Sequence, residues 1–99
     1  MANDTSRNPI FLDTFSADFD LFANGPVRIK AIVFRSGTAS DRFTLEASDG
    51  TNVFDLTTAA NSQAILEFGA DGFPVSRTLT CDVSDGQYAS TARAYIYLA

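Results

Sequence analysis

The chain has 99 residues, a mass of 10.6 kDa and a formal net charge of -5 at pH 7, so it is long enough for one domain and too short for two independent cores. It contains no His, no Trp and one Cys, which removes most side chains that small enzymes use for acid–base, nucleophilic or zinc chemistry. We therefore expect a non-enzymatic protein without cofactor or metal, and the acidic charge argues against nucleic acid or an anionic membrane as partner.

The N-terminal segment, residues 1–23, is rich in phenylalanine. Phe11, Phe15, Phe19 and Phe22 lie four, four and three residues apart, a spacing that suits one face of a helix. However, Asp18 to Phe22 alternates as a strand does, and Phe is a weak helix former. We therefore expect an extended arm that either packs on its own domain or contacts a neighbour. Its removal is expected to weaken attachment or oligomerisation more than folding.

One strand followed by a hairpin is predicted in the first half of residues 24–99. Val27, Ile29, Ala31 and Val33 alternate with Arg28 and Lys30, and Ile32 and Phe34 then make the second face apolar as well. Phe43 to Ala47 and Val53 to Leu56 also alternate and are separated by Asp49-Gly50, which favours a type I′ turn.

The second half continues the pattern of short strands. A strand is expected over 64–68, followed by the turn Gly69 to Gly72, a long alternating strand over 73–83, a turn at Asp85-Gly86 and a closing strand over 92–98. Short strands separated by Gly-containing turns are typical of an all-β fold. We predict a single antiparallel β-sandwich of jelly-roll or Ig-like type over 24–99, preceded by the arm.

Carboxylates and the single thiol are the remaining candidates for chemistry. Asp49, Asp71 and Asp85 each precede a glycine, where Asp is expected for turn geometry, and no spacing matches a known calcium motif. Cys81 lies in the apolar parity of its strand and has no His to activate it, so we expect a buried side chain.

Aromatic side chains are the candidate contacts. Tyr95 and Tyr97 share one face of the last strand, opposite Ala94, Ile96 and Leu98, which suits either a protein interface or a weak platform for sugar rings. The predicted interface residues are therefore Phe11, Phe15, Phe19, Phe22, Tyr95 and Tyr97.

Two stretches carry a resemblance to a known group. The run from Pro26 through Ser36-Gly37-Thr38 to Asp49-Gly50, together with the C-terminal Ala-Tyr-Ile-Tyr-Leu98, resembles small β-rich virion proteins of tailed bacteriophages. The resemblance implies a capsid decoration (cement) protein, a homo-oligomer and commonly a trimer, that binds the major capsid protein or other virion proteins and stabilises the shell. It carries no catalytic residues. The polar start Met1-Ala2-Asn3-Asp4 has no signal peptide pattern, so we expect synthesis in the host cytoplasm, and the resemblance implies residence in the virion.

Two other classes of function remain open. A tail or fibre module that recognises host-surface glycan would use the tyrosine face and the loops Thr38 to Asp41 and Thr57 to Ser62. An acidic adaptor or inhibitor protein would instead cover a basic site on another protein.

Overall fold

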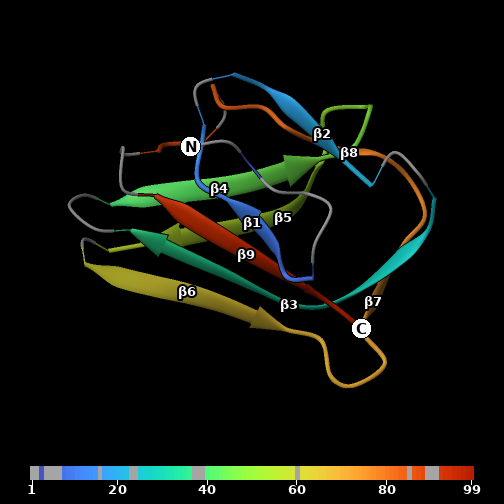
Figure 1. The fold of residues 1–99 in the computed structure, drawn as a ribbon. Helices are drawn as coiled ribbons and strands as arrows, with labels where there is room; N and C mark the ends of the chain where they lie inside the picture. The colour runs from blue at the N-terminus through green and yellow to red at the C-terminus, as the bar shows by residue number, and fades with distance from the viewer. Residues whose placement is uncertain are drawn as a thin grey trace.

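The computed structural model describes residues 3, 8–15, 17–22, 25–36, 40–59, 61–84, 86–88 and 92–99. Within them it contains nine strands and no helix. The strands are β1 (Ile10–Leu12), β2 (Phe19–Leu21), β3 (Val27–Ser36), β4 (Asp41–Glu46), β5 (Asn52–Thr58), β6 (Ser62–Glu67), β7 (Phe73–Val75), β8 (Leu79–Cys81) and β9 (Arg93–Leu98) (Figure 1).

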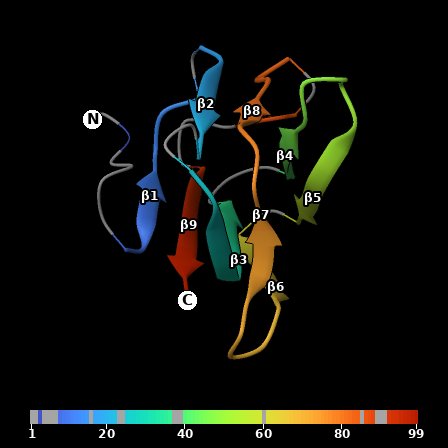
Figure 2. The same ribbon diagram turned by 90° about the vertical axis from the view of Figure 1, so that its right-hand side faces the viewer.

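The strands form two antiparallel sheets. The five-stranded sheet, called sheet A here, has the order β1-β9-β3-β6, and β7 pairs with the other end of β3. The four-stranded sheet, called sheet B, has the order β2-β8-β4-β5. The sheets face each other as two layers (Figures 1 and 2), which confirms the predicted antiparallel β-sandwich.

The core fills the space between the two sheets. Phe34 of sheet A and Phe43 of sheet B are fully buried and stack with ring centroids 5.3 Å apart. Around them, alternate residues of the strands point inward, among them Ile29, Ile32, Leu45, Leu56, Leu79 and Ile96. Burial of these side chains is the main force holding the sheets together.

A β-bulge in β3 explains why its apolar pattern changes partway along. The register against β9 shifts between Ile29 and Ala31, which inserts Lys30 as an extra residue. Ile29 and Ile32 therefore both point into the core, while Ala31 and Val33 lie on the opposite face and are only half-buried. The sequence pattern had placed Ile29, Ala31 and Val33 on one face, and the bulge corrects that assignment.

The N-terminal segment contributes a strand to each sheet. β1 pairs with β9, and β2 pairs with β8, so the chain crosses from sheet A to sheet B between Leu12 and Phe19. Ile10, Leu12 and Leu21 are buried. This arrangement confirms extended structure at residues 10–12 and 19–21 and packs them on their own sandwich.

The prediction of one long strand over 73–83 is wrong, because this segment forms two short strands. The segment divides into β7, in sheet A, and β8, in sheet B, and Arg77 lies at the crossing between them. The apolar parity continues across the break because Val75, Leu79 and Cys81 all face the shared core. An alternating pattern does not distinguish one long strand from two that line the same core.

The β4–β5 connection also differs from the predicted turn type. Gly50 has a φ of 85°, whereas Asp49 is not among the residues with positive φ, so the turn is not of type I′. The Ala47 amide donates to the Thr51 carbonyl and the Gly50 amide donates to the Ala47 carbonyl, both at 2.9 Å. The hairpin therefore closes with a three-residue loop.

Candidate functional site

The outer face of sheet A carries a row of apolar side chains that crosses four strands. Phe11 of β1 lies opposite Tyr95 of β9, Tyr95 lies opposite Val33 of β3, and Val33 lies opposite Ile65 of β6. Directly opposed residues on antiparallel strands share a face, so all four side chains point away from the core. We call these four residues the apolar row.

Exposure distinguishes this row from an ordinary solvent face. Ile65 is 48% exposed and the nearby Tyr97 is 40% exposed. Phe11, Tyr95 and Val33 are half-buried, and the rings of Phe11 and Tyr95 pack with centroids 5.2 Å apart. A contiguous apolar stripe on the solvent side of a sheet is a feature of protein-binding surfaces.

Polar side chains flank the apolar row on both sides. On one side, Arg93, Arg35 and Gln63 are directly opposed across β9, β3 and β6. On the other side, Tyr97, Ala31 and Glu67 are directly opposed across the same strands. The face is therefore positive along one margin and carries a carboxylate along the other.

A shallow groove of about 440 Å³ lies at the margin that holds Tyr97. It is lined by Lys30, Ala31, Glu67, Gly69, Ala70 and Tyr97. The bulge turns Lys30 outward beside Ala31, which places an ammonium group, a carboxylate and an exposed phenol ring around one hollow. Such a set can stack on a flat apolar surface and exchange hydrogen bonds with hydroxyl groups.

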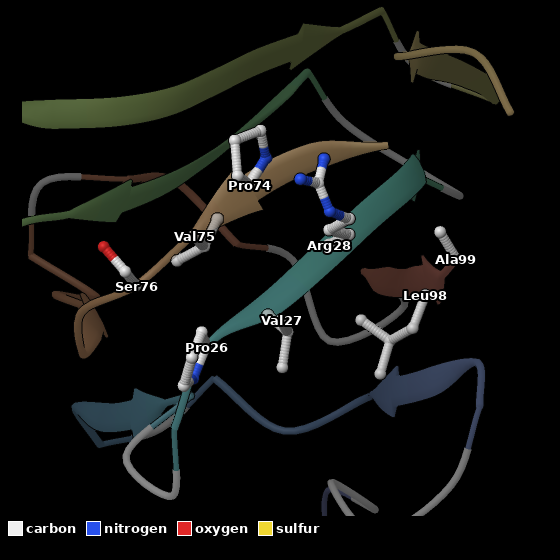
Figure 3. A pocket seen from close by; sticks show the side chains of 8 residues that line it. All are labelled: Pro26, Val27, Arg28, Pro74, Val75, Ser76, Leu98 and Ala99. Atoms are coloured by element: carbon white, nitrogen blue, oxygen red, sulfur yellow. The ribbon is translucent and has the colours of Figure 1, made fainter. Parts of the chain in front are cut away.

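A second hollow, of about 480 Å³, lies where β3, β7 and β9 meet (Figure 3). Most of the described residues that line it are apolar, and Arg28 is the one among them with a charged side chain. The Arg28 guanidinium donates to the Asp71 carbonyl at 3.4 Å. Ser76 supplies a hydroxyl, but the described residues that line this hollow include no Asp, Glu, His or Cys that could act with it as an acid or base.

The structure divides the six predicted interface residues into two groups. Phe11, Tyr95 and Tyr97 lie on the outer face of sheet A. Phe15, Phe19 and Phe22 are half-buried and pack against the core, where Phe15 stacks on Tyr88 with ring centroids 4.3 Å apart. Val33 and Ile65 were not predicted as surface residues, because only the strand order and the bulge place them beside Tyr95.

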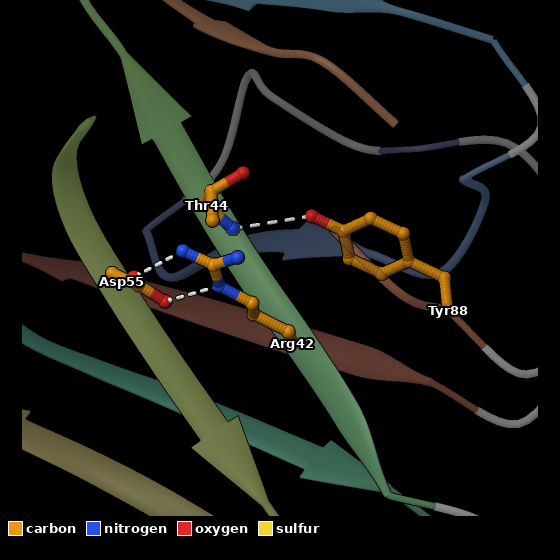
Figure 4. A network of polar contacts seen from close by, with 4 residues as sticks. All are labelled: Arg42, Thr44, Asp55 and Tyr88. Carbon is orange, nitrogen blue, oxygen red and sulfur yellow. Dashed lines mark hydrogen bonds and ion pairs between the residues drawn. The ribbon is translucent and has the colours of Figure 1, made fainter. Parts of the chain in front are cut away.

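A buried thiol and a half-buried phenol lie on the core side of sheet B. The Tyr88 hydroxyl accepts a hydrogen bond from the Thr44 amide at 3.2 Å (Figure 4) and lies 3.4 Å from the Cys81 sulfur. Burial raises the pKa of Cys81 to about 11 and also raises the pKa of Tyr88. Cys81 is fully buried, as predicted, and its raised pKa opposes nucleophilic chemistry at neutral pH.

The outer face of sheet B carries an ion pair. Arg42 donates from Nε and Nη2 to the two carboxylate oxygens of Asp55, at 2.9 and 2.6 Å (Figure 4). The hydrogen bond from Arg42 lowers the pKa of Asp55. Both side chains are more than two-fifths exposed, so the contribution of the pair to folding is small.

Within the described ranges, no group of three or more His, Cys, Asp or Glu side chains is arranged to hold a metal ion. The same part of the chain has no helix long and apolar enough to cross a membrane. Part of the predicted glycan-binding loops, at residues 38, 39 and 60, lies outside the described residues.

Comparison of the chain with protein-family models, with curated proteins and with solved structures finds no significant match.

Proposed function

We propose that this chain is a non-enzymatic structural protein that binds other proteins through the outer face of sheet A, as a capsid decoration protein of a tailed bacteriophage. The observation that carries the proposal is the apolar row of Phe11, Tyr95, Val33 and Ile65. Aromatic and arginine side chains are enriched in protein interfaces, and Arg35 and Arg93 border this row.

A shell-bound role suits a surface of this kind. A sheet face presents its side chains on a rigid backbone, so binding costs little conformational entropy. Many identical sites on a shell also allow modest single contacts to hold firmly if copies are linked to one another. The family resemblance of Pro26 to Gly50 and of the C-terminal strand supports the same role.

The test is attachment to empty capsids of the phage that encodes the chain. Val33→Lys places a charge in the middle of the apolar row, and we expect it to reduce occupancy more than about tenfold because a buried unpaired charge opposes docking. Thr57→Lys is the matched control, since Thr57 is exposed on the outer face of sheet B. Equal occupancy of both variants, each with an unchanged melting temperature, would contradict the proposed binding face.

A second candidate function is recognition of host-surface glycan. The observation that favours it is the groove in which the exposed Tyr97 ring lies beside Lys30 and Glu67. A glycan array probed with the purified protein and with Tyr97→Ala tests this candidate. Retention that is lost in the variant supports it, and the absence of retention on every glycan argues against it.

A further inference from the structure

The open edges of the two sheets are not equally protected against pairing with another strand. β1 and β2 have three residues each, and β7 contains Pro74 at its centre. β5 has a register shift against β4, and its Asp55 is held by Arg42. Short strands, prolines, bulges and charges are the usual devices that block edge-to-edge pairing.

β6 has none of these devices at its centre. Its six residues pair with β3 in an unbroken register from Ala31↔Glu67 to Ser36↔Ser62, and the strand contains neither Pro nor Lys. It forms the outermost arrow of sheet A in Figure 1. Within the part of the chain that the structure describes, no strand pairs with its other side.

The direction of the backbone amides and carbonyls along β6 follows from one hydrogen bond. The Phe68 amide donates to the Lys30 carbonyl at 3.0 Å, which makes Phe68 and Lys30 a hydrogen-bonded pair. Antiparallel pairs alternate between bonded and non-bonded positions. Ser62, Ala64 and Leu66 therefore direct their backbone groups toward β3. The amides and carbonyls of Gln63, Ile65 and Glu67 point away from it.

We propose that β6 pairs in antiparallel fashion with β6 of a second copy of this chain, about a two-fold axis at Ile65. In this register Ile65 lies opposite the partner's Ile65, and Gln63 lies opposite the partner's Glu67. All three outward-pointing residues are used, so the edge is complementary to itself. The two copies of sheet A become one continuous sheet, and their apolar rows join at Ile65.

Charge complementarity favours a second copy of this chain as the partner that pairs with the β6 edge. Arg35 lies directly opposite Gln63 on the outer face, and the proposed pairing places the partner's Glu67 on the far side of Gln63. Two strand spacings of about 4.8 Å separate Arg35 from that carboxylate, within reach of an arginine side chain. No like charges are opposed, and on the inner face Ala64 lies opposite the partner's Leu66.

This contact goes beyond the proposed function, because it requires no capsid and is made through the edge of β6. The two-fold pairing of β6 with β6 produces a dimer and cannot add a third copy, whereas the family resemblance implies a trimer. An edge of six residues buries less than the roughly 800 Å² per partner of a standard interface, so we expect a dimer that forms at high concentration.

Sedimentation velocity over a micromolar to near-millimolar series tests the pairing. Ile65→Pro removes an amide that points away from β3. The variant therefore keeps the hydrogen bonds between β3 and β6 but loses a donor that the pairing with the partner's β6 requires. We expect the wild type to dimerise and Ile65→Pro to weaken the dimer more than about tenfold. Val33→Lys, in the apolar row but not at the edge, is expected to dimerise as the wild type does.

A charge swap keeps the test independent of any folding defect in the proline variant. Glu67→Arg and Arg35→Glu are each expected to weaken the dimer, and the double variant is expected to restore it, because the two charges exchange places across the axis. A wild type that stays monomeric or forms a trimer would overturn the pairing. Dimerisation lost in Val33→Lys but kept in folded Ile65→Pro would instead assign the contact to the sheet face.

Discussion

Tyr88 places its hydroxyl oxygen 3.2 Å from the backbone amide of Thr44, at a point where no residue of a described strand lies opposite Thr44 on the side of β4 away from β5. On that side, β4 pairs with β8 at Glu46↔Thr80 and with Gln87 at Arg42, and the Thr44 amide lies between these two contacts. A side chain thus completes the hydrogen bonding of a sheet whose neighbouring strand has ended.

Removal of that hydroxyl is expected to destabilise the fold. Tyr88→Phe keeps the stacking on Phe15 but leaves the Thr44 amide without its acceptor, at a cost of about 1 to 2 kcal/mol. Urea unfolding monitored by circular dichroism measures the change. Tyr95→Phe, on the outer face, is the control and is expected to stay within about 0.5 kcal/mol of the wild type. Equal effects would mean that the Tyr88 hydrogen bond contributes nothing.

The Cys81 thiol is expected to make the protein less stable in alkali. Its pKa is 9.0 in an unperturbed thiol and about 11 in the fold, so the unfolded chain loses this proton first as pH rises. The contribution of the Cys81 thiol to the free energy of unfolding is fully present below pH 9.0. It is lost as pH rises through about 11, which lowers the free energy of unfolding by up to about 2 to 3 kcal/mol. Denaturant unfolding of the wild type and of Cys81→Ala, across this range and under reducing conditions, should give a flatter profile for the variant.

The same burial predicts that a thiol reagent labels the native protein far more slowly than the unfolded protein. Identical labelling rates with and without denaturant would show that Cys81 is accessible.

The Arg42–Asp55 pair predicts a small effect at acid pH. Because the Arg42 hydrogen bond lowers the pKa of Asp55 below 3.8, the pair contributes at neutral pH and its contribution is lost as pH falls through that lowered pKa. Asp55→Asn should lower the free energy of unfolding by less than about 1 kcal/mol at neutral pH, and by a smaller amount at acid pH. Glu67→Gln, an exposed carboxylate removed elsewhere, is the control in unfolding experiments at both pH values. If Asp55→Asn destabilises the protein equally at acid pH, the effect does not come from the charge of Asp55.

Phe22 has a φ of 66°, a conformation that costs most side chains about 1 kcal/mol. Its ring packs against the core, which offsets this strain. Once the ring is removed, Phe22→Gly should therefore be more stable than Phe22→Ala. At Phe19, which has no positive φ, the alanine variant should be the more stable of the two. Thermal melts of the four variants check the reversal.

Loss of the N-terminal strands is expected to unfold the protein. Leu12 and Leu21 are buried in different sheets, and truncation of either to alanine should cost about 2 to 5 kcal/mol, a large part of the stability of a small domain. Deletion of residues 1–23 removes both, so, in contrast to the expectation from the sequence, we expect the deletion to affect folding most and to give a chain without cooperative unfolding in circular dichroism. Phe11→Ala, on the outer face of β1, should be milder. If the deletion variant still folds, residues 1–23 are a separate arm and are not required by the sandwich.

Local pattern determined much of this protein. Alternation over Val27 to Phe34, Phe43 to Ala47 and Ala92 to Leu98 is read from neighbouring residues alone, so the strands and the all-β class could be predicted, as could the burial of Cys81. These features depend on the two-residue period of a strand and on whether each side chain prefers water.

The tertiary structure alone decided which strands are neighbours and which face is solvent. Phe15 and Phe11 have the same side chain, yet Phe15 stacks on Tyr88 against the core and Phe11 lies on the outer face of sheet A, because Phe15 lies in the segment that crosses from one sheet to the other. The apolar row joins residues from four strands that are far apart in the sequence. Its formation depends on strand order and on the bulge at Lys30, and both reflect the packing of the whole sandwich.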